Sequence, residues 1–292
     1  MPENIIGIIG GSGLYEIEGL KKIKKHNVKT PFGNPSDTII QGTLNNVTLL
    51  FLPRHGKGHR LNPSEVNYRA NIYALKKLGA TRVISVSAVG SLRENIAPGT
   101  LVFVDQYIDR TLGSRKRTFF EEGLVAHVGF GDPSCQNLRE ILEGAAKKAG
   151  ASYLSGGTYI CIEGPQFSTR VESFLYRSWN ADVIGMTNLP EAKLAREAEL
   201  CYCTMALVTD YDCWHEEEED VQADAVLEVI AKNVGLAKKI IANATEGLTQ
   251  KSNCKCGESL KHALVRDPKT SPPKTYRKLE LLVKKYLRGK TK

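Results

Sequence analysis

The sequence lacks any apolar run long enough to span a membrane. A transmembrane helix needs about 20 consecutive apolar residues, and no stretch of this 292-residue chain approaches that length. The N-terminus also lacks the basic segment and long apolar stretch that mark a secretory signal. Hydrophobic residues make up 41% of the chain and charged residues 25%, which is ordinary for a folded domain. We therefore expect a cytoplasmic protein without membrane association.

Net charge is missing from most of the chain. The formal charge is +8, but residues 269–292 hold nine Lys or Arg and one acid, so residues 1–268 sum to zero. A basic C-terminal helix is more typical of a solvated face than of a surface that follows a phosphate backbone. No recognition helix with interleaved aromatic residues precedes it. The sequence therefore argues against nucleic-acid binding.

Cysteines are too few for a secreted disulfide framework: the chain has seven, without a signal peptide. Cys201 and Cys203 lie in an apolar strand and are interpreted as core residues. Cys254 and Cys256 sit in a polar linker where burial is not expected. They indicate either a local disulfide or half of a metal site whose other half is missing. Because a structural zinc site needs four ligands, we expect no metal ion.

The glycine turn after the apolar strand 4–9 falls short of a dinucleotide-binding motif. Starting from Gly11, the third glycine of that motif would fall at Glu16. The turn at 10–13 is either a plain tight turn or a small anion site, made by its backbone N–H groups and the Ser12 hydroxyl.

Strands and helices alternate along the chain, which predicts an α/β fold. We expect strands at 47–52, 82–87, 101–104, 158–162, 182–185 and 201–209, and helices at 62–78, 169–179, 190–199 and from 226 onward. Five strands end in small, polar or ionisable residues, and ligands bind at such ends in open α/β sheets. We expect one large domain at 1–250, with a linker and a basic helix at 251–292 that belong to it.

Two acids follow the strand 201–209. Asp210 and Asp212 are two residues apart, so they project from the same face of an extended backbone. One carboxylic acid can give a proton to a ring nitrogen of a departing purine, while the other accepts a hydrogen bond from an exocyclic amine. The alternative is a polar turn after a buried strand.

A basic loop follows the strand 47–52. It holds Arg54, His55 and His59, and arginine suits a two-point grip on phosphate or carboxylate. Because no neighbouring acid offsets these charges, the loop favours an anion site over an exposed basic loop. The hydroxyls of Ser12, Ser87 and Thr187 would add donors, so these residues together describe a phosphate site without carboxylates for Mg²⁺.

Seven motifs occur in register between about residues 4 and 246. They lie at 10–14, 31–37, 54–56, 90–94, 162–168, 185–187 and 209–214. In this order they resemble the trimeric purine nucleoside phosphorylase family, and within it the members that cleave 5′-methylthioadenosine. The resemblance implies a single domain with a central mixed, partly barrel-like β-sheet flanked by α-helices. It also implies phosphorolysis of 5′-methylthioadenosine to adenine and 5-methylthioribose 1-phosphate, and some activity on adenosine. Inorganic phosphate would be the co-substrate, and no cofactor is implied.

The same resemblance implies a role for individual residues. The implied phosphate site comprises Ser12, Arg54, His55, His59, Ser87, Ala88 and Thr187. The implied nucleoside contacts are Phe167, Ser168, Met186, Asp210, Asp212, Ala223, Val226, Leu227 and, from a neighbouring subunit, His127. Family members often have Thr at the positions of Ser12 and Ser87, and serine keeps the hydroxyl, so we expect activity. Because a neighbour completes each site, a homotrimer or a hexamer is implied.

Asp210 is the candidate general acid. Cleavage of an N-glycosidic bond leaves negative charge on the base, so a proton donor there is useful if its pKa is raised. The exocyclic amine of a 6-amino purine donates a hydrogen bond, which a carboxylate accepts. By the resemblance, the inosine-cleaving relatives instead have Asn at the position of Asp210 and Glu at the position of Ser168. The apolar residues Ala223, Val226 and Leu227 suit a thioether. We therefore predict adenine nucleosides over inosine.

Three other functions remain open at this point. They are a broader purine nucleoside phosphorylase acting on inosine, guanosine or methylthioinosine, a nucleosidase that uses water, and a nucleoside-binding protein without catalysis. The acidic run 216–220 is either the solvated start of the next helix or a mobile lid. Cys254 and Cys256 resemble a cysteine pair of prokaryotic, often heat-adapted relatives in which such cysteines can be oxidised.

Overall fold

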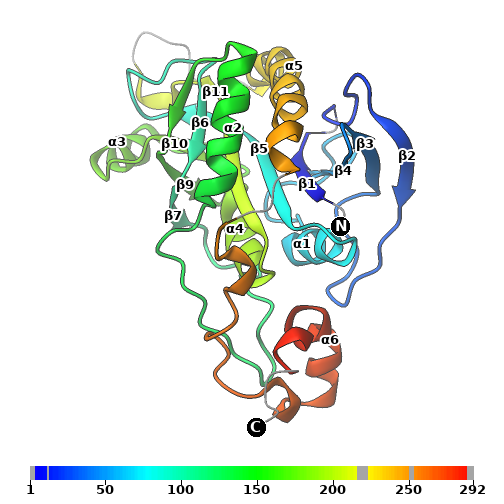
Figure 1. Cartoon of the computed structure of the whole chain (residues 1–292). Helices are drawn as coiled ribbons and strands as arrows, with labels where there is room; N and C mark the ends of the chain where they lie inside the picture. The colour runs from blue at the N-terminus through cyan, green and yellow to red at the C-terminus, as the bar shows by residue number, and fades with distance from the viewer. Residues whose placement is uncertain (1–3, 12, 216–222, 250–252, 288–292) are drawn as a thin grey trace.

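Eleven strands build one mixed sheet in the part of the chain that the structure describes. This computed structural model describes residues 4–11, 13–215, 223–249 and 253–287. The strands are β1 (Ile5–Gly10), β2 (Lys21–His26), β3 (Ile39–Leu44), β4 (Val47–Pro53), β5 (Arg82–Ser91), β6 (Leu101–Val104), β7 (Gln106–Arg110), β8 (Tyr153–Ser155), β9 (Thr158–Ile162), β10 (Val183–Gly185) and β11 (Cys201–Asp210). The main path is β2-β3-β4-β1-β5-β10-β9-β7, and β11 pairs with β5 and β6 (Figure 1). The sheet thus branches at β5, and the predicted α/β class with a mixed sheet is confirmed.

The central strands are buried on both faces. β1, β4, β5 and β11 run parallel to their neighbours in the order β4-β1-β5-β11, and parallel strands covered on both sides have nearly continuous apolar sequences. Successive side chains of β5 enter opposite cores: Val83 packs in one apolar cluster and Ile84 in the other. The carboxyl ends of these four strands therefore lie at one edge of the sheet.

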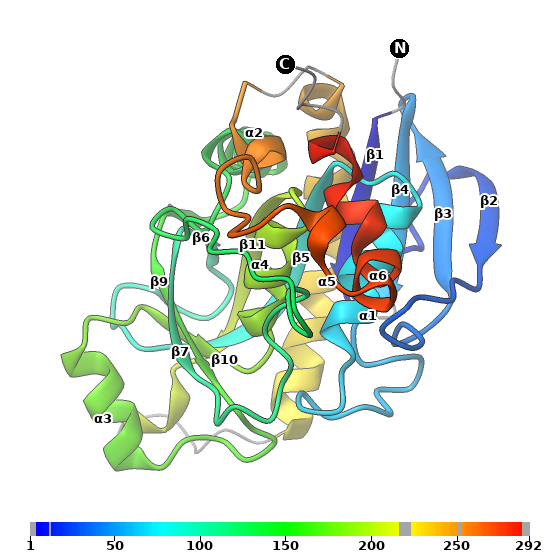
Figure 2. The same cartoon turned by 90° about the horizontal axis from the view of Figure 1, so that it is seen from below.

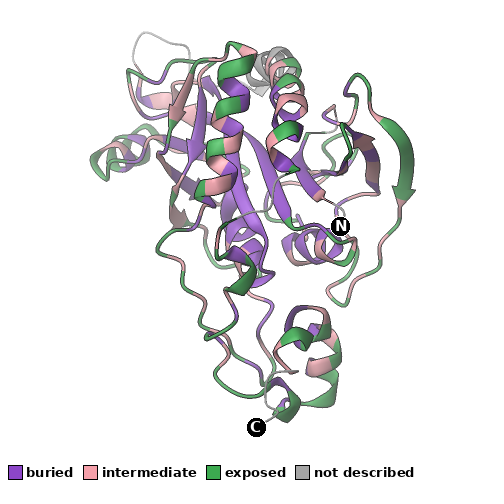
Figure 3. Cartoon of the chain, viewed as in Figure 1, coloured by how far each residue is buried: buried purple, intermediate pink, exposed green. Residues whose placement is uncertain are grey.

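Helices cover both faces. They are α1 (Tyr68–Lys77), α2 (Gln136–Ala149), α3 (Arg170–Ser178), α4 (Asn188–Glu197), α5 (Ala223–Leu248) and α6 (Pro273–Val283). α2 and α5 share the core that contains Ile84, whereas α1, α4 and α6 share the core that contains Val83. Figure 3 shows the buried strands between helices, with α2 partly exposed and α4 largely buried. None of the helices among the described residues combines the length and apolar character required of a bilayer-spanning segment.

Helix α1 begins later than predicted. The sequence favours a helix from Asn62, but α1 starts at Tyr68 and is capped by Asn67. The Asn62 side chain accepts hydrogen bonds at 2.9 and 3.0 Å from backbone N–H groups two and three residues ahead, which closes a local turn in place of a helix. The capping box predicted from Thr169 and Glu172 is present at the start of α3.

The C-terminal segment 253–287 packs against the rest of the molecule. Ala126 and Leu264 form an isolated β-bridge, and α6 places Leu279 in the same apolar cluster as residues of α1 (Figure 2). Cys256 is only 7% exposed. The prediction that burial plays no part at this cysteine is therefore wrong, because the segment folds back onto the core.

Candidate active site

The phosphate-binding candidates come from the end of β4, the interior of β5 and the segment after β10; β5 runs on to Ser91, so the expectation that its strand ends at Ser87 is wrong. β4 leads into Arg54, whose backbone N–H donates to the carbonyl of Gly10 at the end of β1 (2.9 Å). β10 runs antiparallel to β5, so the chain that leaves β10 returns along β5. It places Thr187 beside Ser87, where the two hydroxyls share a hydrogen bond of 3.4 Å.

The purine-binding candidate Asp210 lies beside a later residue of β5. β11 runs parallel to β5 and pairs its last residue, Asp210, with Gly90. A strand rises about 3.3 Å per residue, so the three residues from Ser87 to Gly90 cover about 10 Å. β5 therefore joins two groups of polar side chains that were separate in the sequence.

Arg54 is fixed by partners from distant parts of the chain. Its Nε and Nη2 atoms donate to the Glu191 carboxylate at 2.9 and 3.1 Å, Nη2 also donates to Ser85 Oγ at 2.6 Å, and Nη1 donates to the Val86 carbonyl at 3.0 Å. Burial alone would lower the pKa of Arg54, but the charge and hydrogen bonds of Glu191 outweigh it and raise the pKa. The second N–H of Nη1 has no acceptor among the described residues.

The positive charge predicted for the basic loop is compensated by Glu191. The sequence indicates uncompensated positive charge, but the fully buried Glu191 of α4 neutralises Arg54. The same carboxylate accepts from Ser85 Oγ at 2.7 Å and from the Tyr202 hydroxyl at 2.9 Å. Glu191 stands 137 residues after Arg54, so no local sequence signal could reveal it. An anion bound here would therefore be held by oriented hydrogen-bond donors more than by a net positive charge.

His55 has a defined tautomer. Its Nδ1 lies 2.8 Å from the carbonyl oxygen of Leu61, and because a carbonyl can only accept, Nδ1 carries the proton. Burial and, next, the Arg54 charge lower the pKa of His55 to about 4. The ring stacks on His59 with centroids 4.2 Å apart. Neutral His55 thus offers Nε2 as an acceptor, which suits the protonated oxygen of hydrogen phosphate.

The hydroxyls of Ser87, inside β5, and of Thr187, two residues after β10, are buried but only weakly bonded. Ser87 and Thr187 are each 6% exposed. Thr187 precedes α4 but makes no side-chain capping bond to it. Ser87 Oγ also donates to the Ala88 carbonyl at 3.3 Å, a long contact that a better acceptor could replace. Ser12 lies outside the described residues.

Asp210 is held by its immediate neighbours. It accepts a hydrogen bond from Thr209 Oγ1 at 2.6 Å and another from the backbone N–H of Asp212 at 2.8 Å. A Cβ atom at Gly90 would come within 2.8 Å of Asp210 Oδ1. The close approach of β5 to this carboxylate therefore requires glycine.

Asp212 does not continue the strand as predicted. Its φ of +55° turns the backbone into a short 3₁₀ helix, η1 (Asp212–Trp214), so the expectation of one extended strand carrying both acids is wrong. Asp212 still approaches Gly90 beside Asp210, since a Cβ atom at Gly90 would lie 3.2 Å from the Asp212 Cβ. Asp212 accepts from Ser173 Oγ at 2.6 Å and from Ser168 Oγ at 3.2 Å. These serines fix the direction of its lone pairs.

Burial raises the pKa of both carboxyl groups. For Asp210 the bonds from Thr209 and from the Asp212 backbone oppose this effect in part. For Asp212 the hydrogen bond from Ser173 opposes burial, while the Asp210 charge adds to it. A raised pKa keeps more of the carboxyl protonated as the pH rises, which is what a general acid needs.

A buried arginine that sequence reasoning missed supports Met186. Arg115 is 4% exposed, and its Nη1 donates to the carbonyls of Met186 at 2.6 Å and Leu189 at 2.9 Å. Its Nε donates to Glu163 at 3.1 Å. A Cβ at Gly164 would come 2.5 Å from Met186 Sδ, and the φ of Gly164 is +66°. Glu163 and Gly164 belong to the motif 162–168. That motif was the sequence feature from which a structural role near Met186 could have been predicted.

The remaining candidates have fewer described contacts with the site. Phe167 is next to Ser168 and is 47% exposed. The backbone N–H of His127 donates to the Ala263 carbonyl at 2.8 Å, and among the described residues no hydrogen bond joins His127 to the site. Three further residues belong to α5, but their side chains lie outside the described residues: Ala223, Val226 and Leu227. The acidic run 216–220 is also outside them.

Comparison with known proteins places this geometry in a family. Residues 5–246 match the model of the phosphorylase superfamily. This chain belongs to the phosphorylase superfamily. Its relatives include S-methyl-5′-thioadenosine phosphorylases from Geobacter sulfurreducens, 56% identical with 98% of this chain and 100% of the relative covered, and from Koribacter versatilis, 53% identical with 96% of each covered.

Solved structures of the superfamily agree over nearly the whole chain. A methylthioadenosine phosphorylase from an antarctic soil metagenomic library has a TM-score of 0.90 and 49% identity, and the match covers 95% of this chain and 98% of that one. Methylthioadenosine phosphorylase from Schistosoma mansoni in complex with adenine has a TM-score of 0.81 and 40% identity, covering 88% and 96%. The predicted family membership is confirmed.

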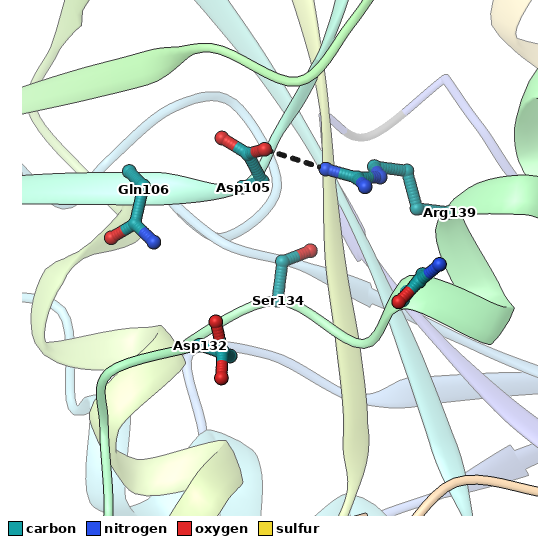
Figure 4. A pocket seen from close by; sticks show the side chains of 6 residues that line it. Asp105, Gln106, Asp132, Ser134 and Arg139 are labelled. Carbon is teal, nitrogen blue, oxygen red and sulfur yellow. Dashed lines mark hydrogen bonds and ion pairs between the residues drawn. The ribbon is translucent and has the colours of Figure 1, made fainter.

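A polar hollow lies away from the predicted site. It is lined by Asp105, Gln106, Asp132, Ser134, Gln136 and Arg139 (Figure 4). Arg139 donates to Asp105 across it at 2.7 Å. Asp132 adds a second negative charge, so the lining does not suit an anionic ligand, and none of the predicted phosphate or nucleoside residues lines the hollow.

Proposed function

We infer that this phosphorylase superfamily member catalyses the phosphorolysis of 5′-methylthioadenosine. Inorganic phosphate attacks the anomeric carbon, and the products are adenine and 5-methylthioribose 1-phosphate, an exchange used in purine and methionine salvage. The observation that carries this conclusion is the arrangement along β5, where Ser87 meets the Thr187 hydroxyl and Gly90, about 10 Å further along the strand, pairs with Asp210. Relatives of that name at 45% to 56% identity support the substrate.

The phosphate end supplies directed donors. The remaining Nη1 N–H of Arg54 and the hydroxyls of Ser87 and Thr187 bind phosphate oxygens, with Ser12, His59 and the backbone at Ala88 completing the site. Neutral His55 accepts from the protonated oxygen. These contacts hold the nucleophile against the anomeric carbon, and positioning of this kind lowers the entropic part of the barrier. No cofactor beyond the phosphate co-substrate takes part in this proposal.

The base end accepts the electrons of the broken bond. As the glycosidic C–N bond breaks, its electron pair moves into the purine, and Asp210 donates its proton to a ring nitrogen so that adenine leaves neutral. Asp212, oriented by Ser168 and Ser173, accepts from the exocyclic amine of adenine. Phe167 lies against the base and Met186 against the ribose, while Ala223, Val226 and Leu227 surround the methylthio group. Adenosine is a further substrate of the same site in this proposal.

The protein acts as a homotrimer in this proposal, alone or paired into a hexamer, and His127 enters the site of a neighbouring subunit. The resemblance to the family is the support for this assembly, because a neighbouring subunit completes each site there. We expect this assembly in the cytoplasm, with no nucleic acid bound.

Product analysis with and without phosphate tests the function. Methylthioadenosine incubated with the enzyme and phosphate should give adenine and 5-methylthioribose 1-phosphate, and removal of phosphate should stop base release. Free methylthioribose formed without phosphate would identify a nucleosidase instead. Equal kcat/KM on inosine or methylthioinosine would identify a broader purine nucleoside phosphorylase, and tight binding without turnover would exclude an enzyme.

A further inference from the structure

Four cysteines from separate parts of the chain meet at one point. The Sγ atoms of Cys135, Cys201, Cys254 and Cys256 all lie within 4.8 Å of one another. Three of the four are buried, and Cys254 is partly buried. Cys254 and Cys256 are the pair that the sequence offers as half of a metal site. Folding supplies the other half.

Three elements bring these sulfurs together. Cys201 is the first residue of β11, and Cys135 immediately precedes α2. The backbone N–H of Cys135 donates to the Tyr202 carbonyl at 2.8 Å, which fixes the start of α2 against β11. Cys254 and Cys256 arrive from the segment after α5, with Cys256 opening the short helix η2 (Cys256–Glu258). The cluster therefore joins the C-terminal segment to the central sheet.

The sulfur spacing suits a single tetrahedral ion. A Zn–S bond of about 2.3 Å places the four sulfurs of a tetrahedral site about 3.8 Å apart, and the observed separations stay within 4.8 Å. Sulfurs of Cys201 and Cys254 are 3.2 Å apart, much longer than a disulfide bond of about 2.05 Å. An iron–sulfur cluster holds several irons and sulfides between its thiolates, and so requires wider spacing than this.

The surroundings favour thiolates at this point. Cys135 occupies the N-terminal cap of α2 without using its sulfur as a capping acceptor, so the positive end of the helix dipole stands beside the cluster. Lys255 lies between the two C-terminal ligands. Four soft sulfur ligands in tetrahedral arrangement select zinc among common divalent ions.

We propose that Cys135, Cys201, Cys254 and Cys256 bind one zinc ion. Four thiolates bind the ion as the four thiol protons leave, which fills its coordination sphere and leaves no position for a substrate. Cys201 begins the strand that Asp210 ends, so about 30 Å of strand separates the ion from the candidate general acid. The zinc ion is therefore structural, and it fastens segment 253–287 to β11 and α2. This site is independent of the proposed function.

Metal analysis of the wild-type protein tests the site directly. Protein purified without chelators should contain about one zinc ion per chain by mass spectrometry, and a mercurial that blocks thiols should release it. Cobalt exchanged into the protein should show the visible bands of a tetrahedral ion and a sulfur-to-cobalt charge-transfer band.

Matched cysteine variants test the ligands. Cys256→Ser should retain less than about one tenth of the zinc and melt at a lower temperature. Cys203→Ser is the control, because Cys203 is buried two residues after Cys201 in the same strand but lies outside the four-sulfur group. It should keep its zinc. If a ligand variant fails to fold, the wild-type measurements still decide.

Three results would overturn the proposal. Metal-free protein with all seven thiols titratable under denaturing conditions would show a thiol cluster without an ion. Metal-free protein with four fewer titratable thiols would show two disulfides. A red protein containing iron in place of zinc would overturn the assignment of the metal.

Discussion

Arg54 at the phosphate end and Asp210 at the base end are held by different kinds of partner. Arg54 is bound by Glu191, 137 residues away, and by Ser85 in a fully buried network. Asp210 takes its bonds from Thr209 and Asp212, within two residues in the sequence. The first end is part of the core and the second is a local turn at the end of a strand.

The two kinds of partner predict different effects of substitution on stability and on catalysis. A buried ion pair loses stability when one partner is removed, because the remaining charge stays buried and unpaired. A strand-end carboxylate held by local bonds can be changed with little effect on packing. We therefore expect substitutions at the base end to affect chemistry first, and substitutions at the phosphate end to affect folding as well.

Substitution of Asp210 has the largest expected effect on catalysis. Asp210→Asn keeps the shape but cannot donate the proton, so kcat on methylthioadenosine should fall about 100- to 10,000-fold. The melting temperature should stay near that of the wild type. The control is Asp105→Asn, which changes a carboxylate that is paired with Arg139 outside the site. Turnover of Asp210→Asn at the wild-type rate would remove this residue from the mechanism.

Substitution of Glu191 tests the other end. Glu191→Gln leaves the Arg54 charge buried without its partner and should lower the free energy of unfolding by about 3 to 5 kcal/mol, measured by denaturant unfolding. The double variant Arg54→Met with Glu191→Met removes both charges and should recover much of that stability while remaining inactive. A Glu191→Gln protein as stable as the wild type would contradict the structural role of the pair.

The pH dependence of kcat distinguishes the two ends without a change in sequence. Burial raises the pKa of Asp210 above its usual 3.8, and the acid must be protonated, so kcat should fall as the pH rises through this raised pKa. Below about pH 4 His55 gains a proton, which removes its Nε2 acceptor and should raise the KM for phosphate. Asp210→Asn should lose the alkaline decline, and an unchanged alkaline limb in that variant would assign it to another group.

The sequence predicts what depends on near neighbours. The capping box at Thr169, the strand leading to Asp210 and the hydroxyl at Thr187 follow from short patterns. Glu191 and Arg115 were missed because a charged residue in a helix or loop looks solvated until its distant partner is known. Distance in the sequence also hid the cysteine cluster, since Cys201 was interpreted as a core residue and folding places it beside Cys135 and Cys254.

Exposed strands also escaped prediction. β2 consists of Lys21–His26, and five of its six residues are exposed. It therefore has no buried face to produce an alternating apolar pattern, and its pairing with β3 supplies the structure that its composition does not indicate.

Substitution of Ser168 should give the smallest effect, confined to recognition of the base. Ser168→Ala removes the 3.2 Å hydrogen bond to Asp212 but leaves the 2.6 Å bond from Ser173. One such bond contributes about 1 kcal/mol, so kcat/KM on methylthioadenosine should fall about fivefold through KM, with kcat nearly unchanged. Ser178→Ala is the control, because this exposed serine of α3 donates only to the Leu175 carbonyl. A fall in kcat as large as that of Asp210→Asn would mean that Ser168 also acts on the proton transfer, and the two carboxylates would then work as one unit.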